Sequence, residues 1–240
     1  MIKGFTGTTL LDFPGRIAAL IFMGGCNFRC PFCHNPGLVK VSDLDRIPTI
    51  PPEEILARLS QRKGFIDGVV ISGGEPLIYR DLLNLIEKIS RLGLATKIDT
   101  NGYFPGHLQG LLDSGLVEYA AMDIKTSPAK YSLAAGTEID YSRIQASVNI
   151  IKESAVNYEF RTTMVPGIVE KDDILLISES VKGAQTYVLQ QFNPHHVLNP
   201  VYEKVKPYPA AVLENYAHLA ENFVKKVIIR NVDPKINQAS

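Results

Sequence analysis

This sequence of 240 residues lacks three features that would tie a protein to nucleic acid, to a membrane or to export. Its 25 lysines and arginines balance 25 aspartates and glutamates, so no strong net charge attracts nucleic acid or an anionic membrane surface. The longest unbroken apolar run, Ile17 to Met23, is far shorter than the roughly 20 residues that span a bilayer. The first residues also carry no secretory pattern. We therefore expect a cytoplasmic protein that binds neither nucleic acid nor a membrane.

Cysteine is absent outside positions 26 to 33, where all three cysteines of the chain lie. A disulfide between two of them would close only a very short loop and would leave one thiol over, so we expect reduced thiols. Structural cysteines would be scattered through a core rather than gathered in one segment. The gathering of Cys26, Cys30 and Cys33 therefore indicates a chemical role for these thiols rather than a role in packing.

Short β-rich runs alternate with amphipathic stretches along the chain. The expected strands span residues 17–23, 68–71, 95–99, 119–124, 158–164, 187–192 and 226–232. The expected helices span residues 52–62, 81–92, 107–114, 142–154, 171–181 and 209–225. This alternation predicts an α/β fold with a parallel sheet, either open or curled into a barrel, and no linker divides residues 1–240. The first dozen residues lie outside the count and can form a hairpin against the first strand.

Charged groups, glycines and thiols follow directly after the expected strands. In parallel α/β folds the functional site lies at the carboxyl ends of the strands, so these segments are expected to share one rim. They are residues 24–34, 72–76, 99–102, 123–125, 161–167 and 193–196.

The three cysteines form a C-x3-C-x2-C pattern, which lets one loop present three thiolates to a compact soft-metal centre. Three thiolates on a cubane of four irons leave one iron open for a ligand, as a catalytic cluster requires. The alternative is a structural zinc site with His34 as the fourth ligand. That alternative is disfavoured because His34 directly follows Cys33 and adjacent side chains tend to point apart.

The cysteine segment resembles that of the radical S-adenosylmethionine enzymes, whose cluster motif is C-x3-C-x-aromatic-C, with Phe32 as the aromatic residue here. The segment from Gly25 to Pro36 is similar to the branch that activates glycyl-radical enzymes. The resemblance runs from residue 12 to about the sixth strand and implies a partial (β/α)6 TIM-type barrel of parallel strands. A short N-terminal extension and an extra C-terminal strand complete the expected fold.

The resemblance also implies which residues bind S-adenosylmethionine. The Gly73-Gly74-Glu75-Pro76 element is expected to bind the amino group of the methionine moiety, because glycines allow close approach and a carboxylate satisfies an ammonium. Alone, the element could be an ordinary turn, but its position about 40 residues after the cysteines supports the assignment. Asp99 resembles an acid that supports the same amino group or a nearby cation, with a helix cap as the alternative.

Further positions follow from the same resemblance. Asp123 and Lys125 flank one residue of a strand, so their side chains share a face, and they are assigned to the ribose and carboxylate of the cofactor. Arg161 is expected to contact the cofactor, with an exposed structural arginine as the alternative. The remaining cofactor-site residues expected in the cysteine loop are Phe32 and His34. The histidine found near the adenosyl group in formate-lyase activases has no clear counterpart, and His195 and His196 are interpreted as a solvated loop pair.

The implied activity is reductive cleavage of S-adenosylmethionine at a [4Fe-4S] cluster, with an electron from a flavodoxin or ferredoxin. The resulting 5'-deoxyadenosyl radical would abstract hydrogen from a glycine of a partner enzyme. The Asp12-Phe13-Pro14-Gly15-Arg16 segment resembles activators of anaerobic ribonucleotide reductase, which we take as the expected partner. Two alternatives remain: a radical enzyme acting on a small molecule, similar to 7-carboxy-7-deazaguanine synthase, and a metal or electron-carrier protein without enzymatic activity.

Overall fold

The computed structural model describes residues 1–232 and shows one sheet of eight strands in chain order, β1 to β8. The strands are β1 (Ile2–Thr9), β2 (Ala18–Met23), β3 (Gly68–Gly73), β4 (Ala95–Thr100), β5 (Tyr119–Asp123), β6 (Asn157–Met164), β7 (Tyr187–Gln191) and β8 (Val227–Arg230). β1 pairs with β2 in antiparallel fashion, and every later pair is parallel. The predicted hairpin against the first parallel strand is thus confirmed.

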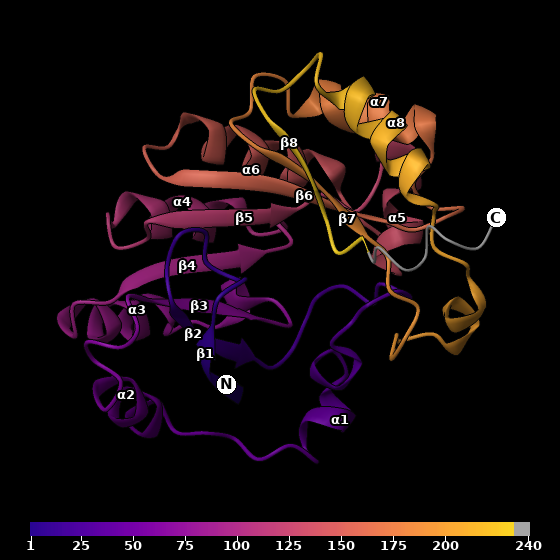
Figure 1. Cartoon of the computed structure of the whole chain (residues 1–240). Helices are drawn as coiled ribbons and strands as arrows, with labels where there is room; N and C mark the ends of the chain where they lie inside the picture. The colour runs from indigo at the N-terminus through magenta and orange to yellow at the C-terminus, as the bar shows by residue number, and fades with distance from the viewer. Residues whose placement is uncertain (233–240) are drawn as a thin grey trace.

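Each parallel crossover contains a helix that buries an apolar face against the sheet. These helices are α2 (Pro52–Ser60), α3 (Leu82–Arg91), α4 (Pro105–Asp113), α6 (Tyr141–Glu153), α7 (Lys171–Ser180) and α8 (Ala210–Ala220). In α3 the buried residues Leu82, Leu85, Ile86 and Ile89 follow the spacing of one helical face. Figure 1 shows α7 and α8 side by side on the outside of the sheet.

The sheet curls but does not close within residues 1–232, because β1 and β8 stand at its two edges and do not pair with each other. Strands β2 to β7 with their helices form the six units of the predicted partial barrel, and β8 is the expected extra strand (Figure 1). Within the same residues, no helix is long and apolar enough to cross a membrane. The expectation of one domain over residues 1–240 stays a prediction, because residues 233–240 lie outside the described part.

Several short elements are absent from the sequence-based prediction. They are the helices α1 (Val41–Leu44) and α5 (Tyr131–Ala135) and the 3-10 turns η1 (Pro36–Leu38), η2 (Pro76–Ile78), η3 (Pro128–Lys130) and η4 (Pro200–Lys204). None exceeds five residues, which is too short for helical periodicity to become visible in a sequence. The predicted helix over 209–225 is also too long, since α8 ends at Ala220.

Candidate functional site

A cavity of about 440 Å³ lies inside the curled sheet, around the carboxyl ends of its strands. Eleven of the twelve site residues expected from the sequence line it, and they come from segments that are far apart in the chain. The eleven are Cys26, Phe32, Cys30, Cys33, His34, Gly73, Gly74, Asp99, Asp123, Lys125 and Arg161. The rim predicted from the strand order is therefore a real feature of the fold.

The three cysteines lie in the loop that connects β2 to η1, and this loop is held by main-chain contacts. The backbone N–H of Cys33 donates to the carbonyl of Cys30 at 3.0 Å. The Arg29 guanidinium donates to the carbonyls of Cys26 and Phe28, and the Arg29 N–H donates to the carbonyl of Ala135 at 2.7 Å. The loop is thus shaped by its own carbonyl groups and by the end of α5.

All three thiols are free, and burial raises their pKa values. The pKa of Cys26 rises to about 11 and that of Cys30 to about 12, because both sulfurs are shielded from water. The positive charge of Lys125 acts in the opposite direction on each thiol. Protonated thiols of this kind ionise when a metal binds, so the loop is poised for a metal and not for a free thiolate nucleophile.

The donor set of the loop fits a [4Fe-4S] cluster. Within residues 1–232, no group of three His, Cys, Asp or Glu side chains is arranged to hold a single metal ion. A tetrahedral zinc site needs its ligands gathered about one ion at about 2.0 to 2.3 Å, whereas a cubane receives each thiolate on a different iron. Cys26, Cys30 and Cys33 would hold such a cluster in the cavity wall, with Lys125 supplying positive charge nearby.

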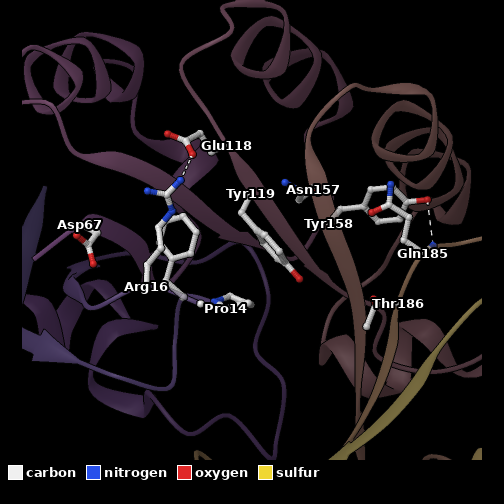
Figure 2. Close-up of a pocket in the computed structure, with 11 residues that line it drawn as sticks. Pro14, Arg16, Asp67, Glu118, Tyr119, Asn157, Tyr158, Gln185 and Thr186 are labelled. Atoms are coloured by element: carbon white, nitrogen blue, oxygen red, sulfur yellow. Dashed lines mark hydrogen bonds and ion pairs between the residues drawn. The ribbon is translucent and has the colours of Figure 1, made fainter.

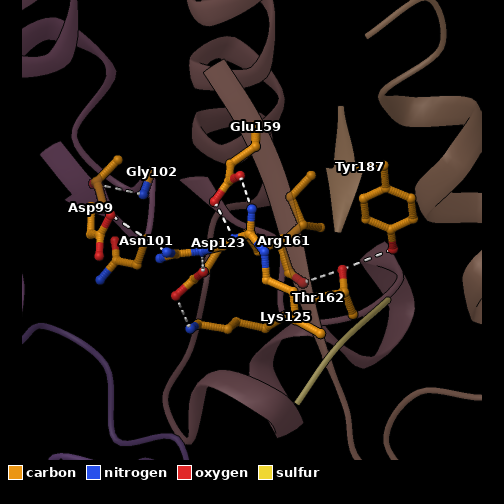
Figure 3. A network of polar contacts seen from close by, with 12 residues as sticks. Asp99, Asn101, Gly102, Asp123, Lys125, Glu159, Arg161, Thr162 and Tyr187 are labelled. Atoms are coloured by element: carbon orange, nitrogen blue, oxygen red, sulfur yellow. Dashed lines mark hydrogen bonds and ion pairs between the residues drawn. The ribbon is translucent and has the colours of Figure 1, made fainter. Parts of the chain in front are cut away.

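A chain of ion pairs crosses the wall of this cavity (Figure 3). Asp123 Oδ2 accepts from Lys125 Nζ at 3.0 Å, and Asp123 Oδ1 accepts from Arg161 Nε at 2.8 Å. Arg161 Nη1 also lies 3.4 Å from Asp99 Oδ1, and Asp99 pairs with Lys97. Arg161 is therefore not an exposed structural arginine, and Asp99 does not cap a helix.

The charges of this chain of ion pairs stabilise one another in their ionised forms. Burial alone would raise the pKa of Asp123, but Arg161 and Lys125 together hold it well below its usual range. The pKa of Asp99 is likewise lowered by Arg161 and Lys97 against the effect of burial. Asp123 shifts the pKa of Lys125 upward. The cavity thus offers carboxylates and cations that keep their charge at neutral pH and can orient a charged ligand.

Glu75 is the one predicted site residue that does not line the cavity. Its side chain is 1% exposed, and its carboxylate accepts from the N–H of Leu77 at 3.1 Å, the Thr100 hydroxyl at 2.7 Å and the N–H of Asn101 at 2.7 Å. Burial raises its pKa to about 7 despite these donors. The geometry favours a role for Glu75 in joining the ends of β3 and β4 over the predicted direct contact with an ammonium group.

The two glycines before Glu75 are required by close backbone contacts. Gly73 has φ of +118°, and a Cβ there would lie 2.4 Å from the backbone nitrogen of Met23. A Cβ on Gly74 would lie 2.1 Å from the carbonyl oxygen of Gly25. These glycines let the end of β3 approach the cysteine loop, and both of them line the cavity.

The histidines occupy different places. His34 is at the cavity margin, and its ring centroid lies 6.2 Å from that of Phe192. His195 and His196 are both exposed, and His196 has φ of 57°, so these two residues match the predicted solvated pair.

A second cavity, of about 530 Å³, lies at the amino ends of the strands (Figure 2). Most of the Asp12–Arg16 segment belongs to this end: Phe13 is buried, and Arg16 pairs with Glu118. Only Asp12 lines the cavity that holds the cysteines. Packing at the amino end thus accounts for Phe13 and Arg16, which makes the segment a weaker guide to a partner than its sequence suggests.

Several polar residues of the cysteine-lined cavity have no individual role in the sequence-based prediction, although all of them except Gln190 lie in the segments expected at the rim. Thr163, Gln190 and Asn193 contribute to its wall, and Asn101 reaches the cysteine loop. Alternation along β6 offered a signal, because the polar residues Glu159, Arg161 and Thr163 occupy every second position of this strand and so share one face.

Comparison with known proteins agrees with this geometry. A profile of the Radical SAM superfamily matches residues 20–177. A Methanocaldococcus jannaschii protein, provisionally named a glycyl-radical enzyme activating enzyme, is 31% identical over 239 residues, covering 97% of each chain. The pyruvate formate-lyase-activating enzyme of Clostridium pasteurianum is 27% identical over 204 residues, covering 82% of each chain.

A solved structure shows the same fold. SuiB of Streptococcus suis, bound to S-adenosylmethionine, superposes with a TM-score of 0.68 at 17% identity. The match covers 92% of this chain and 53% of that one, so the present chain corresponds to about half of SuiB.

The profile match, together with the cysteine loop, assigns the chain to the radical SAM superfamily, whose members use a [4Fe-4S] cluster and S-adenosylmethionine. Within that superfamily, the relative that matches almost end to end places it in the family of glycyl-radical enzyme activating enzymes.

Proposed function

We propose that this protein cleaves S-adenosylmethionine reductively and abstracts a hydrogen atom from the Cα of a glycine in a partner enzyme. The observation that carries the proposal is the position of three free thiols in the same cavity as a chain of paired charges. When bound, the cluster and S-adenosylmethionine supply the one-electron chemistry that yields a 5'-deoxyadenosyl radical. The side chains of this protein bind and orient, and none is required as a general base.

The eleven predicted site residues that line the cavity each have a role in this proposal. Cys26, Cys30 and Cys33 hold the cluster. The backbone at Gly73 and Gly74, which both line the cavity, approaches the methionine moiety. The methionine ammonium and carboxylate carry opposite charges, and so do Asp99 and Arg161 at 3.4 Å from each other. Phe32 and His34 complete the wall beside the cysteines.

Asp123 and Lys125 are assigned to the ribose and carboxylate of the cofactor. Asp123 uses one position on each oxygen for Arg161 and Lys125 and has acceptor capacity left for ribose hydroxyls. Lys125 donates one of its three N–H bonds to Asp123, and the ammonium can donate further to a carboxylate.

The unclosed side of the sheet supports a polypeptide substrate. Asp12 follows the edge strand β1, Asn231 follows the edge strand β8, and both line the cavity. The cavity therefore reaches the two edges of the curled sheet, from which a glycine-bearing loop could enter. The names of two relatives, an activating enzyme of glycyl-radical enzymes and a pyruvate formate-lyase-activating enzyme, support a glycyl-radical enzyme as the partner. We propose anaerobic ribonucleotide reductase as this partner, because residues 12–16 resemble its activators.

The electron donor in this proposal is a flavodoxin or ferredoxin, and the compartment is the cytoplasm, where free thiols stay reduced. Nucleic acid and membranes are not part of the proposed function, since the sequence carries no net charge.

The test is electron paramagnetic resonance of the anaerobic ribonucleotide reductase from the same cell, incubated without oxygen with this protein, reductant and S-adenosylmethionine. The proposal predicts a glycyl radical signal that disappears when Cys30→Ala replaces the wild type. Cofactor cleavage without any glycyl radical on this enzyme would refute the partner. If other glycyl-radical enzymes of the cell also gave no signal, a small-molecule substrate would replace the glycine.

A further inference from the structure

The side-chain amide of Asn101 has hydrogen-bond partners at both its oxygen and its nitrogen. Its Oδ1 accepts from the N–H of Tyr103 at 3.0 Å, and its Nδ2 donates to Asn27 Oδ1 at 2.9 Å. The same Nδ2 lies 3.8 Å from the sulfur of Cys26, within reach of an N–H···S hydrogen bond. A main-chain N–H can only donate, so the contact with Tyr103 fixes which end of the amide faces the sulfur.

The backbone around Asn101 holds this amide in place. The Asn101 N–H donates to the buried carboxylate of Glu75 at 2.7 Å. Gly102 follows with φ of +74°, and a Cβ there would lie 2.1 Å from the side chain of Met122. The carbonyl of Gly102 accepts from the Ser147 hydroxyl at 2.6 Å. Asn101 itself is 6% exposed, so the amide has little freedom to turn away from Cys26.

Cys26 differs from the other two cysteines in this respect. Its sulfur accepts from the N–H of Phe28 at 3.3 Å and from the Asn101 side chain. Within residues 1–232, Cys26 is the thiol that a side-chain N–H reaches. Cys26, which follows β2, thus differs from the other two expected cluster ligands because it has a side-chain hydrogen-bond donor, Asn101, which follows β4.

We propose that Asn101 is a positioning residue that donates a hydrogen bond to the Cys26 thiolate of the bound cluster and raises the cluster's reduction potential. Reduction adds a negative charge to the cluster, and a donor to a ligand sulfur stabilises the reduced form more than the oxidised form. The inference rests on the cluster assigned above. It also explains the position of Glu75, whose carboxylate accepts from the Asn101 N–H and so fixes the backbone that carries the Asn101 side chain.

The test compares Asn101→Ala with Asn27→Ala in anaerobically reconstituted protein without S-adenosylmethionine. The reduced cluster is followed by electron paramagnetic resonance during a dithionite titration. We expect Asn101→Ala to lower the ratio of reduced to oxidised cluster about tenfold at a fixed potential, which is about 59 mV for one electron. Asn27→Ala removes the other partner of the same amide and should leave the potential at its wild-type value.

Equal potentials in the wild type and an iron-replete Asn101→Ala variant would overturn the inference. If Asn101→Ala loses its iron, Asn101→Leu decides, because leucine has a shape close to that of asparagine, lacks the N–H and adds no charge. A lowered potential in iron-replete Asn101→Leu supports the inference, whereas a wild-type potential, or loss of iron in both variants, overturns it. Absence of iron from the wild type would instead refute the cluster assignment.

Discussion

The Asp123→Asn variant tests how the charged wall of the cavity binds S-adenosylmethionine. Each carboxylate oxygen of Asp123 already accepts one bond, from Arg161 at 2.8 Å and from Lys125 at 3.0 Å, which leaves acceptor capacity for the cofactor. After Asp123→Asn, the side-chain amide can satisfy only one of the two cations through its oxygen, and the negative charge is lost. Loss of one charge-assisted hydrogen bond costs about 1.5 to 3 kcal/mol, or about a 10- to 150-fold higher Kd.

The measurement is calorimetric titration of S-adenosylmethionine into anaerobically reconstituted protein, with iron content determined in parallel. Iron content should match the wild type, because Asp123 is not a ligand of the cluster. The matched control is Asp173→Asn, which also breaks an Asp–Lys pair, with Lys130 at 2.7 Å, but does so outside the cavity. A wild-type Kd for Asp123→Asn, or an equal loss of affinity in Asp173→Asn, would refute the assignment.

Three further variants probe the loop, the glycines and the sheet edge. Cys30→Ala should abolish both iron retention and cofactor cleavage, because two thiolates do not hold the cubane; unchanged cleavage would contradict this. Gly74→Ala places a Cβ 2.1 Å from the backbone oxygen of Gly25 and should impair cofactor cleavage. Gly110→Ala, which has open space around it, should retain wild-type cleavage. Equal product yields from the two variants would show that the close contact between Gly74 and Gly25 is unimportant. Glu159→Ala removes two hydrogen bonds between Glu159 and Arg230, at 2.8 and 2.7 Å. This change should lower the free energy of unfolding, measured by urea titration, by about 3 kcal/mol. A change near zero would show that the pair does not stabilise β8.

The sequence predicted the sheet well because each parallel strand is a short apolar run followed by a helix with a clear apolar face. The amphipathic spacing in α3, for example, located this helix to within one residue at each end. α1 and α5 could not be found in this way, since four or five residues do not complete a periodic pattern. Their positions depend on contacts with the loops around them.

The candidate site could be predicted where the spacing of residues within one segment fixes their relative positions. It could not be predicted where contacts between distant segments fix the orientation of a side chain. The spacing of Asp123 and Lys125 predicted that their side chains share a face, and in the structure Lys125 Nζ lies 3.0 Å from Asp123 Oδ2. The orientation of Glu75 toward Thr100 and Asn101 depends on how β3 and β4 meet, which no local pattern encodes. For the same reason the contact between Asn101 and Cys26, 75 residues apart, emerges only in the fold.

The most direct test of the central claim is an anaerobic cleavage assay with reconstituted protein, dithionite and S-adenosylmethionine. The account predicts about four irons per chain and formation of 5'-deoxyadenosine and methionine, both lost in Cys30→Ala. Stoichiometric zinc without iron after anaerobic purification, and no 5'-deoxyadenosine from the reconstituted wild type, would contradict it.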